Sequence, residues 1–327
     1  PPSTRRKRWM ATVHFRIRRR NSDPIRTHLQ SSRFASPVIL QLFCSIRPRQ
    51  WVKNVVVLAA VVFSEHLLDA AYVVTALSAA GVFVLLSSAV YLVNDLADAE
   101  ADRLHPDKAR RPIASGELPK PVAASAAVLL LAGGLVGAVL LHRDFAVVAL
   151  IYAVLNLAYS LGLKRAVLVD ILIVAAGFLL RAVGGAVVVD VDISTWFILC
   201  TFTLTLFLAA AKRRGELVRL EGDAPRHRES LGDYDVAYLD QVMSVLASAT
   251  VVCYALYAMG VGEGGITANR QMQWTIPFVL YGVLRYMYLV YRGEGDDPTA
   301  LLWRDRALQV NLLLWGGLSM GLVYGAR

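Results

Sequence analysis

One amide and three carboxylates, spaced for a common helix face, are the side chains in this sequence best suited to chemistry. Asn94, Asp95, Asp98 and Asp102 lie within nine positions. Because an α-helix turns about 100° per residue, the three carboxylates fall within about 60° of one another, with Asn94 beside them. Carboxylates so placed repel one another, and the dipole at a helix C-terminus disfavours them further. Mg²⁺ relieves both effects, since it prefers oxygen ligands and bridges phosphate oxygens. We therefore predict that these four residues hold Mg²⁺, for which Mn²⁺ can substitute, rather than forming a solvated acidic helix end.

A basic segment follows directly. Pro106 ends the predicted helix, and Lys108, Arg110 and Arg111 come next. Several cations beside a metal-binding carboxylate cluster suit a polyphosphate, whose many oxygens need neutralising. Ordinary positive charge on the cytoplasmic side of a membrane is the alternative explanation for any one of them. We predict that all three bind substrate phosphates.

Membrane-spanning helices must position these residues. Of the 327 residues, 56% are hydrophobic and only 18% are charged. A helix needs about 20 apolar residues to cross the hydrocarbon core, and apolar runs near that length recur along the chain. We predict an all-α integral membrane protein with a single transmembrane domain at residues 39–327, whose nine spans lie at 52–66, 71–94, 121–141, 145–161, 167–189, 195–211, 241–261, 273–291 and 307–325.

The charge distribution predicts how these spans are oriented. The net charge is +9, a value that nucleic-acid-binding proteins also show. With a cytoplasmic N-terminus and alternating spans, however, the cytoplasmic segments carry 29 Lys and Arg residues and the outer segments carry three. This is the positive-inside pattern, so the basic pI needs no nucleic acid. We predict a multi-pass protein of the plasma (inner) membrane with a cytoplasmic active site, preceded by a basic, disordered or interfacial arm at residues 1–38 that anionic lipid attracts.

The acidic segment resembles a family motif. Residues 94–102 have the pattern Asn-Asp-x-x-Asp-x-x-x-Asp, which is similar to the first aspartate motif of the UbiA-type intramembrane transferase superfamily. The resemblance implies nine transmembrane helices around a central cavity that opens to the cytoplasm, with the motif binding a Mg²⁺-diphosphate. Prenyltransferases of this superfamily carry a second aspartate-rich motif after the sixth span, but here Lys212 and Arg213 lead and Glu216 follows. Lys212 and Glu216 are four residues apart, so we predict that they pair on a helix face that shares the cavity of Asp98.

This departure resembles the polyprenyl-phosphate phosphoribosyltransferase branch of the superfamily. A phosphoribosyl donor has a 5-phosphate besides its diphosphate, and the second phosphate favours Lys and Arg. Similar blocks run through residues 47–54, 159–170 and 177–185. For Lys53, an interfacial anchor is the alternative role. The resemblance implies catalytic roles for Asp95, Asp98, Asp102 and Lys53, and substrate-binding roles for Asn94, Gln50, Asn54, Tyr159, Lys164, Asp170, Arg181, Lys212, Arg213, Glu216, Arg228 and Tyr234.

The predicted reaction moves the 5-phosphoribosyl group of 5-phosphoribosyl 1-diphosphate onto polyprenyl (decaprenyl) phosphate, giving polyprenyl-phosphoribose 5-phosphate and pyrophosphate. The resemblance implies that the product feeds arabinose donors for actinobacterial cell-wall arabinan, and a homotrimer would fit the branch. Two alternatives stay open. One is a UbiA-type prenyltransferase with a quinone or haem-type acceptor. The other is a polytopic transporter of a phosphorylated lipid or sugar, which could use Asp170 and Arg181 at membrane depth but would not need metal-binding carboxylates.

Overall fold

The computed structural model describes residues 37–105, 108–219, 233–261, 270–294 and 298–325. Within these ranges every regular element is helical and no β-strand is present, as the sequence predicts. The predicted N-terminal arm lies outside them except for its last two residues. In chain order the elements are α1 (Val38–Ser45), η1 (Pro48–Leu58), α2 (Ala59–Phe63), α3 (Ala70–Ala97), α4 (Ala99–Leu104), η2 (Lys108–Arg110), α5 (Pro112–Ser115), α6 (Lys120–Leu141), α7 (Arg143–Leu161), η3 (Leu163–Arg165), α8 (Val169–Val188), α9 (Thr195–Arg219), α12 (Val236–Ala258), η4 (Arg270–Thr275), α13 (Ile276–Leu289), η5 (Val290–Glu294), α14 (Pro298–Arg304) and α15 (Arg306–Tyr324).

Seven of the described helices are long and apolar enough to cross a membrane, namely α3, α6, α7, α8, α9, α12 and α15. The other two predicted spans, 52–66 and 273–291, are divided into shorter elements, so a count of nine is not confirmed. The first consists of the 3-10 helix η1 and five residues of α2, and the second of η4, the 14-residue α13 and η5. A 3-10 helix rises about 2.0 Å per residue, so η1 and α2 together still reach about 30 Å, the thickness of the hydrocarbon core.

Local backbone and packing explain the position of η1. Arg47 precedes it in the left-handed region, with φ of 54°, and Pro48 begins the helix. At the far end η1 lies directly against α8, because a Cβ atom added to Gly185 would come within 2.0 Å of the carbonyl oxygen of Val57. Only glycine permits this approach. The contact brings the predicted site residues of η1 beside those of α8.

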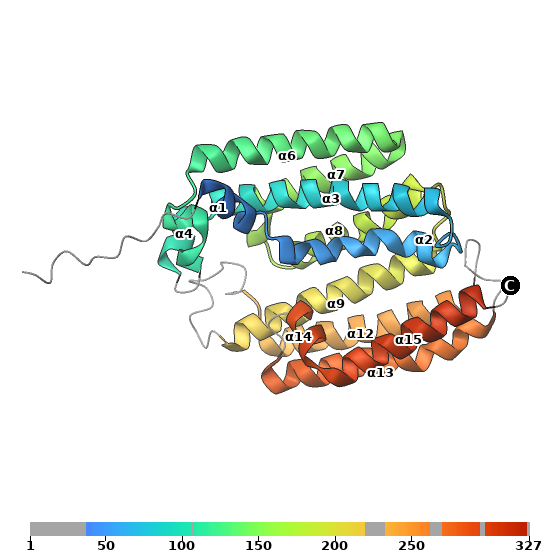
Figure 1. The fold of residues 1–327 in the computed structure, drawn as a ribbon. Helices are drawn as coiled ribbons and strands as arrows, with labels where there is room; N and C mark the ends of the chain where they lie inside the picture. The colour runs from blue at the N-terminus through green and yellow to red at the C-terminus, as the bar shows by residue number, and fades with distance from the viewer. Residues whose placement is uncertain (1–36, 106–107, 220–232, 262–269, 295–297, 326–327) are drawn as a thin grey trace, which may run out of the picture. The chain divides into compact units, whose positions relative to one another are not determined.

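The helix α8 lies between two halves of the bundle. In Figure 1, α3, α6 and α7 lie on one side of it, and α9, α12, α13 and α15 lie on the other. A core cluster that includes Phe83, Phe145 and Tyr152 joins α3 to α7, and a second cluster that includes Ile171 and Phe207 joins α8 to α9 and α12. Side chains of α8 can therefore reach partners in both halves.

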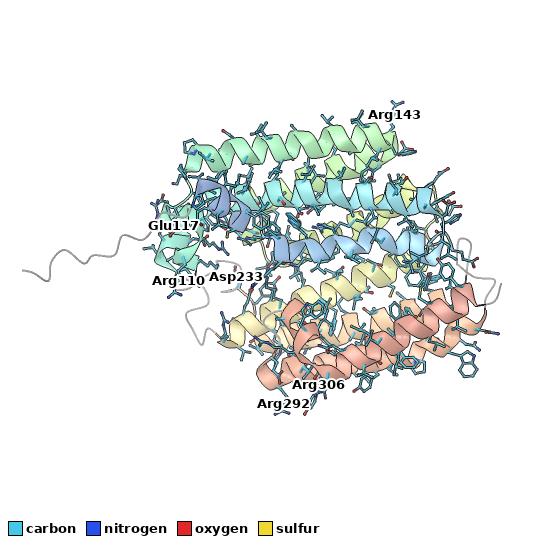
Figure 2. The ribbon with its side chains drawn as sticks, viewed as in Figure 1. Arg110, Glu117, Arg143, Asp233, Arg292 and Arg306 are labelled. Atoms are coloured by element: carbon cyan, nitrogen blue, oxygen red, sulfur yellow. The ribbon has the colours of Figure 1, made fainter. Side chains whose placement is uncertain are left out.

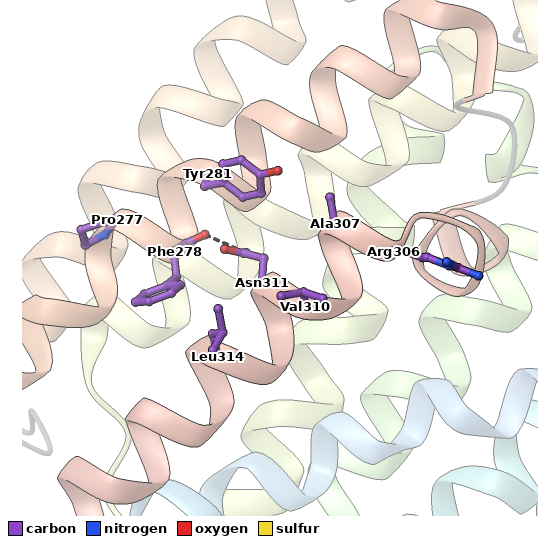
Figure 3. Close-up of a pocket in the computed structure, with 8 residues that line it drawn as sticks. All are labelled: Pro277, Phe278, Tyr281, Arg306, Ala307, Val310, Asn311 and Leu314. Carbon is purple, nitrogen blue, oxygen red and sulfur yellow. Dashed lines mark hydrogen bonds between the residues drawn. The ribbon is translucent and has the colours of Figure 1, made fainter.

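Outward-facing apolar residues and a groove mark the surface of the bundle. On α6, Leu129 and Leu140 are 72% and 80% exposed, as suits a helix that faces lipid. Between α13 and α15 a mainly apolar groove has Arg306 near one end, and Asn311 donates a hydrogen bond of 2.9 Å to the carbonyl oxygen of Phe278 across it (Figure 3). None of the predicted site residues lines this groove.

Candidate active site

The acidic motif spans the junction of α3 and α4. Asp95 belongs to the last turns of α3, Asp102 belongs to α4, and Asp98 lies between the two helices with φ of −91° and ψ of 0°. The backbone N–H of Asp98 still donates to the carbonyl of Asn94 at 2.9 Å, and that of Asp102 to the carbonyl of Asp98 at 2.8 Å. The helical register predicted for the motif therefore continues through the junction. The side chains of Arg110 and Asp233 lie at this end of the bundle, and Arg143 lies at the opposite end (Figure 2).

Two arginines neutralise the two buried carboxylates. Arg47 and Arg111 donate to the same Oδ1 atom of Asp95, at 2.5 and 3.0 Å. Arg111 Nη1 also donates to Asp102 Oδ2 at 2.7 Å. The side chains of Asp95 and Asp102 are only 3% and 5% exposed. One guanidinium bridging both carboxylates shows that they share a helix face, as their spacing predicts.

Asp98 is the most accessible of the three carboxylates. Its side chain is 30% exposed and forms an ion pair with Lys164 of η3. The same ammonium donates to Asn94 Oδ1 at 3.2 Å. The connection between α7 and α8 thus supplies a cation to the motif, and the polar surface of the site includes Asp98, Asn94 and Lys164.

Lys108 connects the acidic motif to α9. It is half-buried in η2, and burial together with the neighbouring charge of Arg111 lowers its pKa. The charges of Asp102, Glu216 and Asp98 act in the opposite direction, which places Lys108 within electrostatic reach of all three. The charge of Lys108 can therefore act on the carboxylates of the acidic motif and on Glu216. The neighbouring Arg110 is exposed.

A second polar cluster links the start of α8 to the end of α9. Asp170 is fully buried and accepts hydrogen bonds from Arg213 Nε and from the Tyr234 hydroxyl, both at 2.8 Å. Arg213 also donates to Glu216 at 2.5 Å, and Lys212 Nζ lies 3.8 Å from Glu216, in the predicted pairing. The Tyr234 hydroxyl accepts from the backbone N–H of Leu168 at 2.7 Å, and burial with its hydrogen bond to Asp170 raises its pKa. Arg213, Asp170 and Tyr234 are thus held by protein groups, whereas the Lys212 side chain is 46% exposed.

A third polar group lies deeper, where η1, α7 and α8 meet. Arg181 is 6% exposed and donates to Asn54 Oδ1 at 2.7 Å, to the carbonyl of Gly177 at 2.9 Å and to the Tyr152 hydroxyl at 2.7 Å. Arg181 and Asn54, predicted from separate blocks of sequence, are therefore in direct contact.

The remaining predicted residues are more dispersed. Gln50 and Lys53 are half-buried on η1, and Tyr159 is half-buried on α7 within electrostatic reach of Arg213. Arg228 lies outside the described residues. Two residues of the site, Arg47 and Tyr91, are absent from the set predicted from sequence. The guanidinium carbon of Arg47 lies 5.0 Å from the centroid of the Tyr91 ring, in a cation–π contact.

Sequence offered only weak signals for these two residues. Both belong to stretches that carry the family resemblance, Arg47 directly before Pro48 and Tyr91 one turn before Asp95. Their roles depend on the turn that Arg47 makes in the left-handed region, which no local pattern shows.

The oxygen atoms of the acidic motif suit a Mg²⁺ ion whose coordination is completed by substrate. Among the described residues no group of three carboxylate, His or Cys side chains forms a ready-made metal cage. Mg²⁺ is usually held by one or two carboxylates together with waters and substrate phosphates. Asp98 and Asn94 are accessible, and Asp95 and Asp102 lie on the same face, so these oxygens fit that mode of binding.

Comparison with known proteins places the chain in a family. It matches the model of the UbiA prenyltransferase family over residues 54–313. It is 40% identical to the decaprenyl-phosphate phosphoribosyltransferase of Mycolicibacterium smegmatis, with 86% of this chain and 92% of that protein covered, and 40% identical to the protein of the same name from Mycobacterium tuberculosis, with 83% and 90% covered. A UbiA homolog from Archaeoglobus fulgidus, solved bound to GPP and Mg²⁺, has the same fold, with a TM-score of 0.66 over 86% of this chain and 99% of that one at 16% identity. The chain is thus a multi-pass membrane protein that belongs to the UbiA prenyltransferase family.

Proposed function

We propose that the protein transfers the 5-phosphoribosyl group from 5-phosphoribosyl 1-diphosphate to decaprenyl phosphate or a similar polyprenyl phosphate. The observation that carries this proposal is the mixture of charges at the site. Carboxylates of α3 and α4 are interleaved with Arg47, Arg111, Lys164 and Lys108, and α9 adds Lys212 rather than a second acidic motif. Such a surplus of cations suits a donor with two separate phosphate groups. The names of the 40% identical relatives support the same reaction.

In this proposal the acidic residues bind the metal ion and the basic residues bind the phosphate groups. Asn94, Asp95, Asp98 and Asp102 would hold Mg²⁺, which when bound neutralises the charge that develops on the leaving pyrophosphate. Arg47, Arg111 and Lys164 form ion pairs with these carboxylates, and with Mg²⁺ bound they would be free to contact diphosphate oxygens. Lys108 and Lys212 receive the 5-phosphate.

In the transfer step, an oxygen of the lipid phosphate bonds to C1 of the ribose. The bond from C1 to the diphosphate oxygen breaks, and its electron pair leaves with pyrophosphate. The attacking phosphate is already anionic, so no strong base is required. The contribution of the protein is to hold two anions in line.

The proposed setting is the cytoplasmic face of the plasma membrane, since the cytoplasmic segments of the predicted topology carry 29 Lys and Arg residues against three outside. The product would supply arabinose donors for cell-wall arabinan.

Mn²⁺ would replace Mg²⁺, since both favour oxygen ligands. Assembly as a trimer, which would fit the branch, is testable by mass measurement in detergent.

A label-transfer assay tests the function. Purified protein receives either 5-phosphoribosyl 1-diphosphate labelled in the ribose with decaprenyl phosphate as acceptor, or radiolabelled geranyl diphosphate with a quinone-type acceptor, and label is counted in the lipid product. Label should enter lipid only from the phosphoribosyl donor, should stop with EDTA, and should be lost in Asp98→Asn. Lys120→Gln, which removes an exposed partner of Glu100, is the matched control and should remain active. Transfer from geranyl diphosphate instead would identify a prenyltransferase, and no transfer from either donor would overturn both assignments.

A further inference from the structure

Arg181 is a buried cation for which the described part of the chain supplies no anionic partner. It donates three hydrogen bonds, to an amide oxygen, a backbone carbonyl and a tyrosine hydroxyl, all of them neutral groups. The rings of Tyr152 and Phe178 lie 4.7 and 5.4 Å from its guanidinium carbon. Among the described residues no carboxylate pairs with it. In contrast, Arg213 pairs with Asp170 and Arg285 pairs with Asp305. An ionisable group at membrane depth normally has a partner or a function.

Two donors on η1, one of them on the residue that contacts Arg181, have no acceptor among the described residues. Asn54 is 2% exposed, and its Oδ1 atom accepts from Arg181, which fixes the opposite side of the amide as a donor. That Nδ2 atom has no hydrogen-bond partner. The same is true of the buried Nε1 atom of Trp51. Trp51 and Asn54 are three residues apart on η1, and in a 3-10 helix such residues are eclipsed on one face. A buried donor without an acceptor is costly, so these two donors call for an acceptor beyond the described residues, which a bound ligand would supply.

This inner donor cluster, defined as Arg181, Asn54 and Trp51, lies on the membrane side of the acidic motif. Tyr91, one helical turn before Asp95, is within electrostatic reach of Arg181, Arg47 and Asp95. The guanidinium of Arg181 reaches back to the carbonyl of Gly177, eight residues after α8 begins, which is about 12 Å along the helix. The cluster is therefore about two to three turns deeper than the helix end and adjoins the metal-binding face.

We propose that the inner donor cluster binds the phosphate of the lipid acceptor, a phosphomonoester on an isoprenoid chain. This inference rests on the proposed function and names the subsite for its second substrate. The leaving pyrophosphate is assigned to the carboxylate side, and attack with inversion must come from the opposite side of C1. A lipid phosphate whose chain remains in the bilayer approaches from the membrane side, where the inner donor cluster lies. Its oxygens supply the acceptors that Asn54 and Trp51 lack and the negative charge that Arg181 lacks.

Equilibrium binding of the acceptor, measured without donor, separates this proposal from the proposed reaction. Radiolabelled decaprenyl phosphate is bound to the detergent-solubilised protein and then displaced with phosphatidic acid or with inorganic phosphate. Arg181→Gln and Asn54→Asp should each weaken decaprenyl phosphate binding about tenfold or more, the equivalent of one lost charge-assisted hydrogen bond. Asn54→Asp keeps the shape of the amide and gives Arg181 an internal anion. Arg285→Gln, at an arginine that already has a carboxylate, should leave this affinity unchanged.

The kinetic readout assigns the subsite to one substrate. In the transfer assay both cluster variants should raise KM for decaprenyl phosphate about tenfold and leave KM for the phosphoribosyl donor within about twofold. A rise in the donor KM instead would assign the cluster to the donor and overturn the proposal. Unchanged acceptor binding with a lowered melting temperature would mean that Arg181 serves packing alone. Displacement by inorganic phosphate as effective as by the lipids would mean a free-phosphate site. If the wild-type protein binds decaprenyl phosphate through this cluster but transfers no phosphoribose, the proposed function fails while the subsite stands.

Discussion

Arg111→Gln should destabilise the protein mainly when no divalent cation is present. Arg111 bridges Asp95 and Asp102, whose side chains are 3% and 5% exposed. Removing one partner of a buried ion pair typically costs about 3–5 kcal/mol, because the other charge is left uncompensated. Asp95 retains Arg47, and Arg111 itself is 27% exposed, so we expect the lower end, about 3 kcal/mol.

Divalent cations should reverse most of this loss. A cation bound to the folded state at 100 times its Kd adds about 2.7 kcal/mol of stability. In the variant the cation does not have to displace Arg111 from two carboxylates, so it should bind more tightly than in the wild type. Mg²⁺ should therefore rescue the stability of Arg111→Gln while turnover stays low, because the diphosphate has lost one of its cations.

Thermal unfolding in detergent, in EDTA and in excess Mg²⁺, measures both effects. A loss of about 3 kcal/mol corresponds to a melting temperature about 5–10 °C lower in EDTA, and the gap should shrink by more than half with Mg²⁺. Lys120→Gln is the control, since its ion pair with Glu100 is on the surface and should not shift the midpoint measurably. Equal melting of Arg111→Gln and wild type in EDTA, or a gap that Mg²⁺ does not narrow, would refute the idea that Arg111 takes the place of a metal ion.

Three further outcomes follow from the geometry. Gly185→Ala should lower the melting temperature markedly in a thermal scan, because its Cβ would overlap a carbonyl oxygen of η1 at 2.0 Å, while Gly81→Ala, with nothing within 4 Å, should not. Burial lowers the pKa of Lys108, so its ammonium group should lose its proton at a lower pH than is usual for lysine. Donor affinity should fall as that positive charge is lost. Donor KM measured against pH should show this alkaline rise, and Lys108→Arg should move it to higher pH. Asp305→Ala removes the N-cap of α15 and should lower the free energy of unfolding by about 1 kcal/mol, with a further loss from its ion pair with Arg285. Asp235→Ala removes only the longer cap hydrogen bond of α12, so it should lower the free energy of unfolding less.

Periodicity and charge predicted most of the fold and the face of the acidic motif. The long apolar runs form the seven candidate spans, and the three-and-four spacing of the carboxylates places Asp95 and Asp102 under one guanidinium. Both features depend on neighbours along one helix, which sequence spacing describes directly. The i, i+4 pairing of Lys212 and Glu216 belongs to the same class.

Contacts between distant segments were beyond the reach of sequence patterns. Nothing local indicates that Lys164 pairs with Asp98, or that Asp170 is held by Arg213 and Tyr234. The roles of these residues as substrate ligands stay predictions. The replacement of the first span by a 3-10 helix also has no compositional signal, and the close approach of Gly185 to η1 joins segments that are far apart in the sequence.

The tight winding of η1 governs which of its side chains point together. In an α-helix, residues three apart are rotated by about 60° from alignment, whereas in a 3-10 helix they coincide. Rewinding Pro48–Leu58 as an α-helix would shorten it by about 5 Å, roughly the rise of one α-helical turn. It would also rotate the indole of Trp51 away from the amide of Asn54 around the helix axis. The N–H groups of Trp51 and Asn54 can therefore point to one ligand only while η1 keeps its 3-10 winding.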